Sequence, residues 1–102
     1  MNKSREKLIE MLSEKINVGL ATNILGRLVE LSSKEDGVHF INDVLRRGDE
    51  ELGRLSSKPF VEDYVMLNKL ASCGLVFEAG TGYHYRITDA GKQLYKDIQS
   101  ER

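Results

Sequence analysis

The sequence is short of several residue types, and each shortage excludes a class of protein. It has one cysteine, one proline and no tryptophan among 102 residues. The lone Cys73 can form neither an internal disulfide nor a multi-cysteine metal site. The longest apolar run, Tyr64–Leu67, has four residues, far from the roughly 18 of a membrane span. We therefore expect no membrane partner.

Neither sign of charge is in excess. Lys and Arg total 15 and Asp and Glu total 16, so the net charge is −1 and no global positive field marks a nucleic-acid binder. No apolar segment follows the charged N-terminus, so we expect no signal peptide and a cytoplasmic protein. The length predicts a single domain over residues 1–102, with an N-terminal helix over about 1–16, a core over 17–88 and a C-terminal helix over 89–102.

Apolar residues at helical spacing predict four helices in the first three quarters of the chain. Ser4 is a candidate N-cap for a helix that runs to about Ile16, and a second helix spans about Val18 to Leu31. The fourth runs from about Pro59 to Ser72 and stops at Gly74. A short third helix is marked by four apolar residues: Phe40, Ile41, Val44 and Leu45.

The pattern after Gly74 predicts a β-hairpin and a last helix. Two strands, Leu75–Ala79 and Tyr83–Ile87, flank the glycine turn Gly80–Gly82, and Thr88 is placed to cap the final helix. Because an isolated hairpin is unstable in water, its apolar side chains must pack on the helices: Tyr83, Tyr85 and Ile87. The predicted fold is α+β and mainly helical, in the order α-α-α-α-β-β-α.

About forty residues, from Pro59 to Ile98, carry a more specific pattern. It is Leu67-x-x-Leu70-x-x-x-Gly74-Leu75-Val76, a short hairpin, then Tyr85-x-Ile87-Thr88-x-x-Gly91-x-x-Leu94. The pattern resembles the winged helix-turn-helix regulators of the MarR and PadR families. The resemblance implies a dimeric, sequence-specific regulator of transcription that binds double-stranded DNA, with no enzymatic activity and no cofactor. It also implies that the helix over 59–72 enters the major groove and that the hairpin over 75–87 is the wing.

Candidate DNA contacts follow from a helical wheel. Counting about 100° per residue from Leu67 predicts one buried face of the fourth helix: Phe60, Tyr64, Leu70 and Ala71. The opposite face carries Val61, Glu62, Val65, Lys69 and Ser72. The candidate contacts are Ser57, Lys58, Val61, Val65 and Lys69 in the helix, with His84 and Arg86 in the wing. Arg46-Arg47 are a further possibility, although cations near a helix C-terminus are also favoured by its dipole.

The charges leave an alternative open. Lys58, Glu62, Asp63 and Lys69 sum to zero between residues 57 and 73, whereas phosphate attraction supplies most of the affinity for duplex DNA. The alternative is a winged-helix protein-interaction module that binds a protein through the Val61/Val65 face and does not bind DNA.

The terminal helices carry apolar stripes that need a partner. The first stripe is Leu8, Met11, Leu12 and Ile16, and the last is Leu94, Tyr95 and Ile98. They pack on each other within one chain or pair between two chains. We favour a homodimer, because MarR-like proteins dimerise through terminal helices.

The remaining chemistry-bearing residues favour structural roles. Cys73 is expected to be a small, partly buried residue. His39 and His84 lie on different elements without further ligands, so we expect no metal. Three adjacent carboxylate pairs are expected to be solvated charges: Glu35-Asp36, Glu50-Glu51 and Glu62-Asp63.

Overall fold

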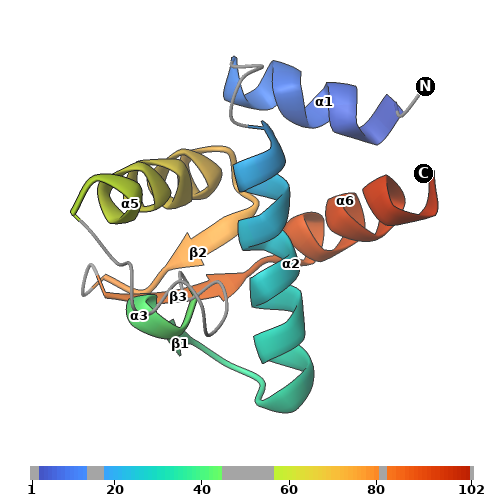
Figure 1. The fold of residues 1–102 in the computed structure, drawn as a ribbon. Coiled ribbons are helices and arrows are strands. Elements are labelled where there is room, and N and C mark those ends of the chain that lie inside the picture. The colour runs from blue at the N-terminus through green and yellow to red at the C-terminus, as the bar shows by residue number, and fades with distance from the viewer. Residues whose placement is uncertain (1–2, 14–17, 45–56, 81–82, 102) are drawn as a thin grey trace.

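The structure, a computed structural model, describes residues 3–13, 18–44, 57–80 and 83–101. It is an α+β fold, mainly helical (Figure 1). The elements in chain order are α1 (Lys3–Leu12), α2 (Val18–Lys34), β1 (His39–Phe40), α3 (Ile41–Val44), α5 (Ser57–Ser72), β2 (Val76–Glu78), β3 (His84–Ile87) and α6 (Asp89–Ser100).

The predicted hairpin is present, but it belongs to a larger sheet. β2 and β3 pair antiparallel, and β1 pairs antiparallel with the other side of β3, giving the order β1-β3-β2. Tyr85 therefore lies between His39 on β1 and Glu78 on β2. The prediction of a two-stranded wing missed β1, because two residues are too few to show the alternation that identifies a strand.

Helix α2 is the centre of the core. It packs against α5, α6 and β3, and Figure 1 shows it crossing the middle of the molecule. Ala21, Leu25 and Leu28 on this helix are completely buried. The helix continues one turn beyond the predicted end at Leu31, to Lys34.

Helix α1 is tied to α6, the helix at the other end of the chain. Leu8 and Leu12 are buried, and α1 ends at Leu12, four residues before Ile16, which lies outside the described residues. Ser4 was predicted to cap α1 but lies inside it. Its backbone N–H and hydroxyl donate to the two carboxylate oxygens of Glu101, at 3.0 and 2.5 Å. This distant carboxylate accepts from donors in the first turn of α1, and the two bonds lower the pKa of Glu101.

The connection from β3 to α6 is closely packed, as the sequence predicts from Thr88. The Thr88 hydroxyl accepts from the Gly91 backbone N–H at 3.0 Å and donates to the Gly74 carbonyl at 2.8 Å. A Cβ atom on Gly91 would lie 2.1 Å from the Leu75 carbonyl oxygen, so only glycine fits there. Gly74 has a φ of 80°, the positive value predicted for the residue that ends α5. These contacts fix the strands relative to α5.

In the described parts of the chain, no helix is both long and apolar enough to cross a membrane.

Candidate nucleic-acid interface

Helix α5 packs against the sheet and α2 through a face that differs from the predicted one. Met66, Leu67 and Leu70 are buried as apolar core residues, and Asp63 is buried beside them with 4% exposed. Tyr64, predicted to be buried, is 37% exposed. The buried arc is centred between Met66 and Leu67, about 50° from the direction that the wheel assumed, because Met66 shares the core. This rotation carries Tyr64 outward, so its predicted burial was wrong. Asp63 lies only about 40° from Leu67 on the wheel, within the buried arc, so the prediction of a solvated charge, which rested on its residue type, was also wrong.

The outer face of α5 brings two predicted contacts together. Val65 is 48% exposed, and Lys69, one turn later, is also exposed. Glu62 is exposed on the same side, as predicted for a solvated charge. Three other candidates, Ser57, Lys58 and Val61, belong to α5 by their backbone, but their side chains lie outside the described residues.

Asn68 is an outer-face residue that the sequence reasoning missed. It is exposed. Asn68 lies three residues after Val65 and Lys69 lies four after it, so each of the two is a neighbour of Val65 on the helix surface. The Asn68 Nδ2 donates to the Tyr64 carbonyl oxygen at 3.2 Å. The wheel placed Asn68 about 100° from Leu67, at the edge between the two faces. We call Val65, Asn68 and Lys69 the outer triad.

The hairpin presents its two predicted contacts on the sheet face that points away from α5. Tyr85 and Ile87 are buried under the helices, and side chains alternate along a strand, so His84 and Arg86 point to the opposite face. The Arg86 guanidinium lies 5.4 Å from the ring centre of Phe77, its partner across the strands. The contact of His84 and Arg86 with DNA stays a prediction, and the interface proposed below does not include them.

Tyr83 is the hairpin residue on the α5 side. The alternation puts it on the same face as Tyr85, and its backbone carbonyl continues the ladder by accepting from the Ile41 N–H at 2.7 Å. We predicted that Tyr83 would pack on the helices, but it is 60% exposed. Tyr83 lies one residue before β3 begins, and its burial was a wrong prediction.

A tyrosine pair connects α5 with the hairpin. The side chains of Tyr64 and Tyr85 are hydrogen-bonded, although Tyr64 is partly exposed and Tyr85 is fully buried. Burial, the bond to Tyr64 and the charge of Glu78 raise the pKa of Tyr85 to about 12. The pair therefore holds the outer edge of α5 against β3.

The residues predicted to form a dimer are already covered within one chain. Leu8, Leu12, Leu94 and Ile98 are buried, while Met11 and Tyr95 are partly buried against the core. α1 packs on α6, and both pack on α2. The terminal stripes therefore pack on each other within one chain, which is one of the two predicted arrangements. Ile16, the last residue of the first stripe, lies outside the described residues. The homodimer stays a prediction.

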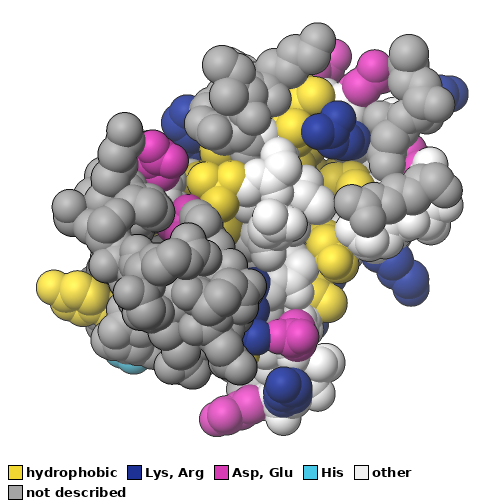
Figure 2. Space-filling view, in the orientation of Figure 1, with side chains coloured by type: hydrophobic (Ala, Val, Ile, Leu, Met, Phe, Trp, Pro, Cys, Tyr) yellow, Lys and Arg dark blue, Asp and Glu magenta, His cyan; other side chains and the backbone are white. Residues whose placement is uncertain are grey.

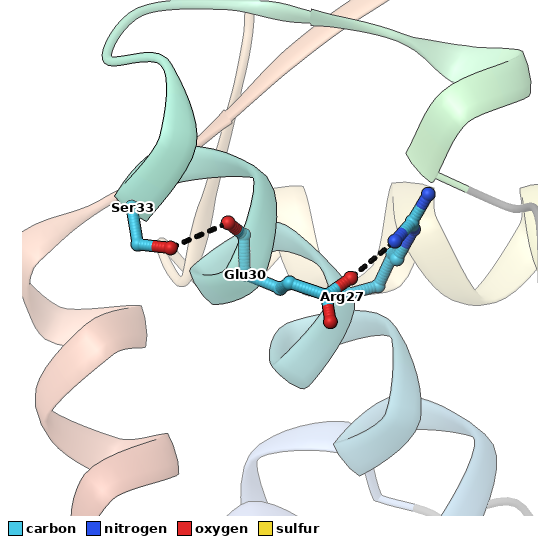
Figure 3. A network of polar contacts seen from close by, with 3 residues as sticks. All are labelled: Arg27, Glu30 and Ser33. Atoms are coloured by element: carbon cyan, nitrogen blue, oxygen red, sulfur yellow. Dashed lines mark hydrogen bonds and ion pairs between the residues drawn. The ribbon is translucent and has the colours of Figure 1, made fainter.

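Other polar groups have local roles. Figure 3 shows Arg27, Glu30 and Ser33 along α2, where the Arg27 guanidinium pairs with the Glu30 carboxylate and the Ser33 hydroxyl donates to the Glu30 carbonyl at 2.7 Å. Partly exposed pairs of this kind stabilise a helix slightly. Cys73 is partly buried, as predicted, with its thiol 3.2 Å from the Met11 carbonyl oxygen. His39 is buried, and among the described residues its Nε2 has no hydrogen-bond partner.

The described side chains form no cluster of metal ligands, and those on the face shown in Figure 2 form no basic band. No group of three or more His, Cys, Asp or Glu residues among them is placed to hold a metal ion. On the face shown in Figure 2, basic and acidic side chains of the described residues are interspersed. Arg46-Arg47 and Glu50-Glu51 lie outside the described part of the chain.

No family model and no solved structure matches this chain. The resemblance to MarR and PadR regulators therefore stays a prediction.

Proposed function

We propose that this chain is a winged-helix protein that binds double-stranded DNA, with α5 in the major groove and the turn end of the β2–β3 hairpin against the neighbouring backbone. The observation that carries the proposal is the arrangement of α5. One face of the helix packs on the sheet and on α2, while the outer triad is exposed on the opposite side of the helix. A helix held by a sheet on one side and open on the other is suited to enter a groove.

The dimensions and the element order agree with this function. A helix of 16 residues is about 24 Å long, and the major groove, about 12 Å wide, admits an α-helix. Among the described elements, helices α2, α3 and α5 precede the hairpin, an order that supports a winged-helix arrangement. Because α5 packs directly on β2, the hairpin is held in position relative to α5. A fixed hairpin supports a second contact at a constant distance from the first.

The charges set the expected strength of binding. Among the described residues on the outer face of α5, Glu62 carries one negative charge and Lys69 carries one positive charge, so the two cancel. A neutral face gains little from releasing counterions, so one protomer should bind weakly and with a shallow dependence on salt. A homodimer that occupies two half-sites would raise the affinity through effective concentration, and regulation of transcription would follow from occupancy of such a site.

Fluorescence anisotropy with mixed-sequence duplex DNA tests the proposal. We expect binding at low salt that weakens as salt is raised, and a clear loss of affinity in Lys69→Glu. Lys96→Glu is the matched control, because Lys96 is an exposed lysine on α6. If both variants bind DNA with the same affinity as the wild type, α5 does not contact the DNA. Absence of binding even at low salt would overturn the proposal.

The second candidate is a protein-interaction module, and one observation favours it. The exposed surface of α5 includes Tyr64 and Val65, two large apolar residues next to each other in the chain. Exposed apolar patches commonly mark protein-binding sites. If the chain fails to bind duplex DNA at low salt, the same α5 surface becomes the place to seek a protein partner.

A further inference from the structure

We propose that the outer triad selects sites containing adjacent A·T base pairs, with Val65 packed on a thymine methyl group and Asn68 hydrogen-bonded to an adenine edge. The inference rests on the proposed DNA-binding function and adds to it the class of sequence that α5 recognises. It also gives a role to Asn68, which the sequence analysis did not select.

The exposed side chain of Val65 is suited to contact with a thymine methyl group. Val65 is nearly half exposed on the outer face of α5. In the major groove, the thymine methyl is the apolar group of a base pair, and apolar side chains contact it there. Valine can donate or accept no hydrogen bond, so this position distinguishes thymine by packing alone.

The position and bonding of Asn68 are suited to contact with an adenine edge. Residues i and i+3 are neighbours on a helix, so Asn68 and Val65 would meet the same base pair or adjacent ones. An amide binds adenine in a bidentate manner, with its N–H on N7 and its oxygen on the N6 amino group. In this chain the amide donates to the Tyr64 carbonyl, which uses one of its two N–H groups. The other N–H and the oxygen suffice for the adenine edge, and the bond to Tyr64 orients them.

Electrostatic attraction between α5 and DNA is expected to be weak. Glu62 and Lys69 are oppositely charged on the exposed side of α5. Attraction to phosphate is independent of sequence, and here it adds little to the difference between sites. Discrimination must therefore come from the two uncharged members of the triad, while Lys69 positions the helix on the backbone.

Base-analogue substitution tests the inference in a selected duplex. Sites are first enriched from a randomised duplex library, and we expect adjacent A·T pairs among them. Thymines of a selected site are then replaced by uracil, which removes only the methyl group. Loss of one buried methyl should weaken binding of the wild type about fourfold. Replacing adenine by 7-deazaadenine removes N7 and should weaken binding about fivefold.

Two variants and two matched controls connect each effect to its residue. In Val65→Ala the sensitivity to uracil should disappear, whereas Val38→Ala should keep it, because Val38 is a similarly exposed valine outside α5. In Asn68→Ala the sensitivity to 7-deazaadenine should disappear, whereas Asn23→Ala, on exposed α2 surface, should keep it.

The outcomes distinguish a failure of the proposed base preference from a failure of the proposed DNA-binding function. If no duplex is enriched and no salt-dependent binding occurs, the proposed function itself fails. If duplexes bind but the wild type is indifferent to both analogues, the DNA-binding function stands and this inference is overturned. Sensitivity that persists in Val65→Ala and Asn68→Ala would overturn it as well.

Discussion

The inner and outer faces of α5 differ in how far the fold accounts for their residues. On the inner face, Met66, Leu67 and Leu70 fill the space between the sheet and α2, and each is at most 2% exposed. On the outer face, Val65 is 48% exposed and stands beside Asn68 and Lys69. Packing explains the first set fully. It gives no reason for the second, and this contrast directs the search for function to the outer face.

The sheet shows the same contrast in a weaker form. Phe77 is as exposed as Val65, but Arg86 from the neighbouring strand lies against its ring. An apolar side chain that has such a neighbour is explained by the fold itself. Exposure alone therefore does not identify an interface, and the surroundings of each residue decide.

The largest expected effect comes from truncating the inner face. Leu67→Ala should lower the free energy of unfolding by about 4 kcal/mol, because a fully buried leucine leaves a cavity. Val65→Ala should change it by at most about 0.5 kcal/mol, as for an ordinary surface substitution. Urea denaturation followed by circular dichroism measures both. A large loss in Val65→Ala would show that the outer face supports the fold after all.

A smaller loss is expected where the strands meet α6. Gly91→Ala should cost about 3 kcal/mol, since its Cβ would overlap the Leu75 carbonyl oxygen and force the backbone apart. Gly19→Ala is the control: nothing lies within 4 Å of a Cβ there, and alanine favours a helix. The same denaturation experiment should show the control to be at least as stable as the wild type. Equal stability of Gly91→Ala would contradict the close approach at this junction.

Tyr64 lies at the border between the two faces and should have an intermediate effect. Tyr64→Phe removes the hydrogen bond to Tyr85 and should cost about 1 kcal/mol. The pKa of Tyr85, about 12 in the wild type, should fall but stay above its ordinary value, because burial, the largest cause, remains. An ultraviolet titration of tyrosinate measures it.

The same group predicts how alkaline pH affects stability. Because the folded pKa of Tyr85 exceeds the unfolded one, the folded state holds its proton more tightly. The resulting stabilisation is complete below the unfolded pKa and is lost as pH rises toward about 12. Denaturation of the wild type across this range should show falling stability, with a smaller decrease in Tyr64→Phe. Equal decreases in stability in the wild type and in Tyr64→Phe would show that the hydrogen bond between Tyr64 and Tyr85 does not contribute to this pH dependence.

The smallest effect is expected on the outer sheet face. Arg86→Ala should cost about 0.5 kcal/mol, the contribution of a partly exposed contact between a cation and an aromatic ring. Its DNA affinity should fall less than that of Lys69→Ala, because Arg86 points away from α5. Equal losses of affinity in the two variants would extend the interface to this side of the hairpin.

Much of the fold follows from the sequence because its signals are local. Thr88 has the hydroxyl of an N-cap, and Gly74 allows the positive φ that ends a helix. The hairpin strands alternate, and the α2 stripe has helical spacing. The two-residue β1 is too short for any periodic signal and forms only because β3 offers it a partner.

The candidate site could be predicted only in part, because small rotations and long-range contacts decide it. Val65 and Lys69 lie far enough from the core that an error of about 50° leaves them outside, whereas Asn68 and Tyr64 lie near the border and are assigned to the wrong side. Asp63 lies within the buried arc in either case, and its charge alone led to the wrong expectation. Tyr83 precedes the first residue of β3, and its exposure is set by tertiary packing that the alternation of residue types does not contain. The contact of Ser4 with Glu101 joins residues 97 positions apart, which no local pattern contains.

Chemical-shift mapping with isotope-labelled protein shows whether the outer triad of α5 contacts DNA. A selected duplex is titrated into the protein, and the shifted amide and side-chain signals are placed on the structure. We expect the largest changes at Val65, Asn68 and Lys69, smaller ones near Tyr83, and little change on the outer sheet face around Val38 and Phe77. Changes concentrated on that sheet face, with α5 unaffected, would contradict the proposed contact.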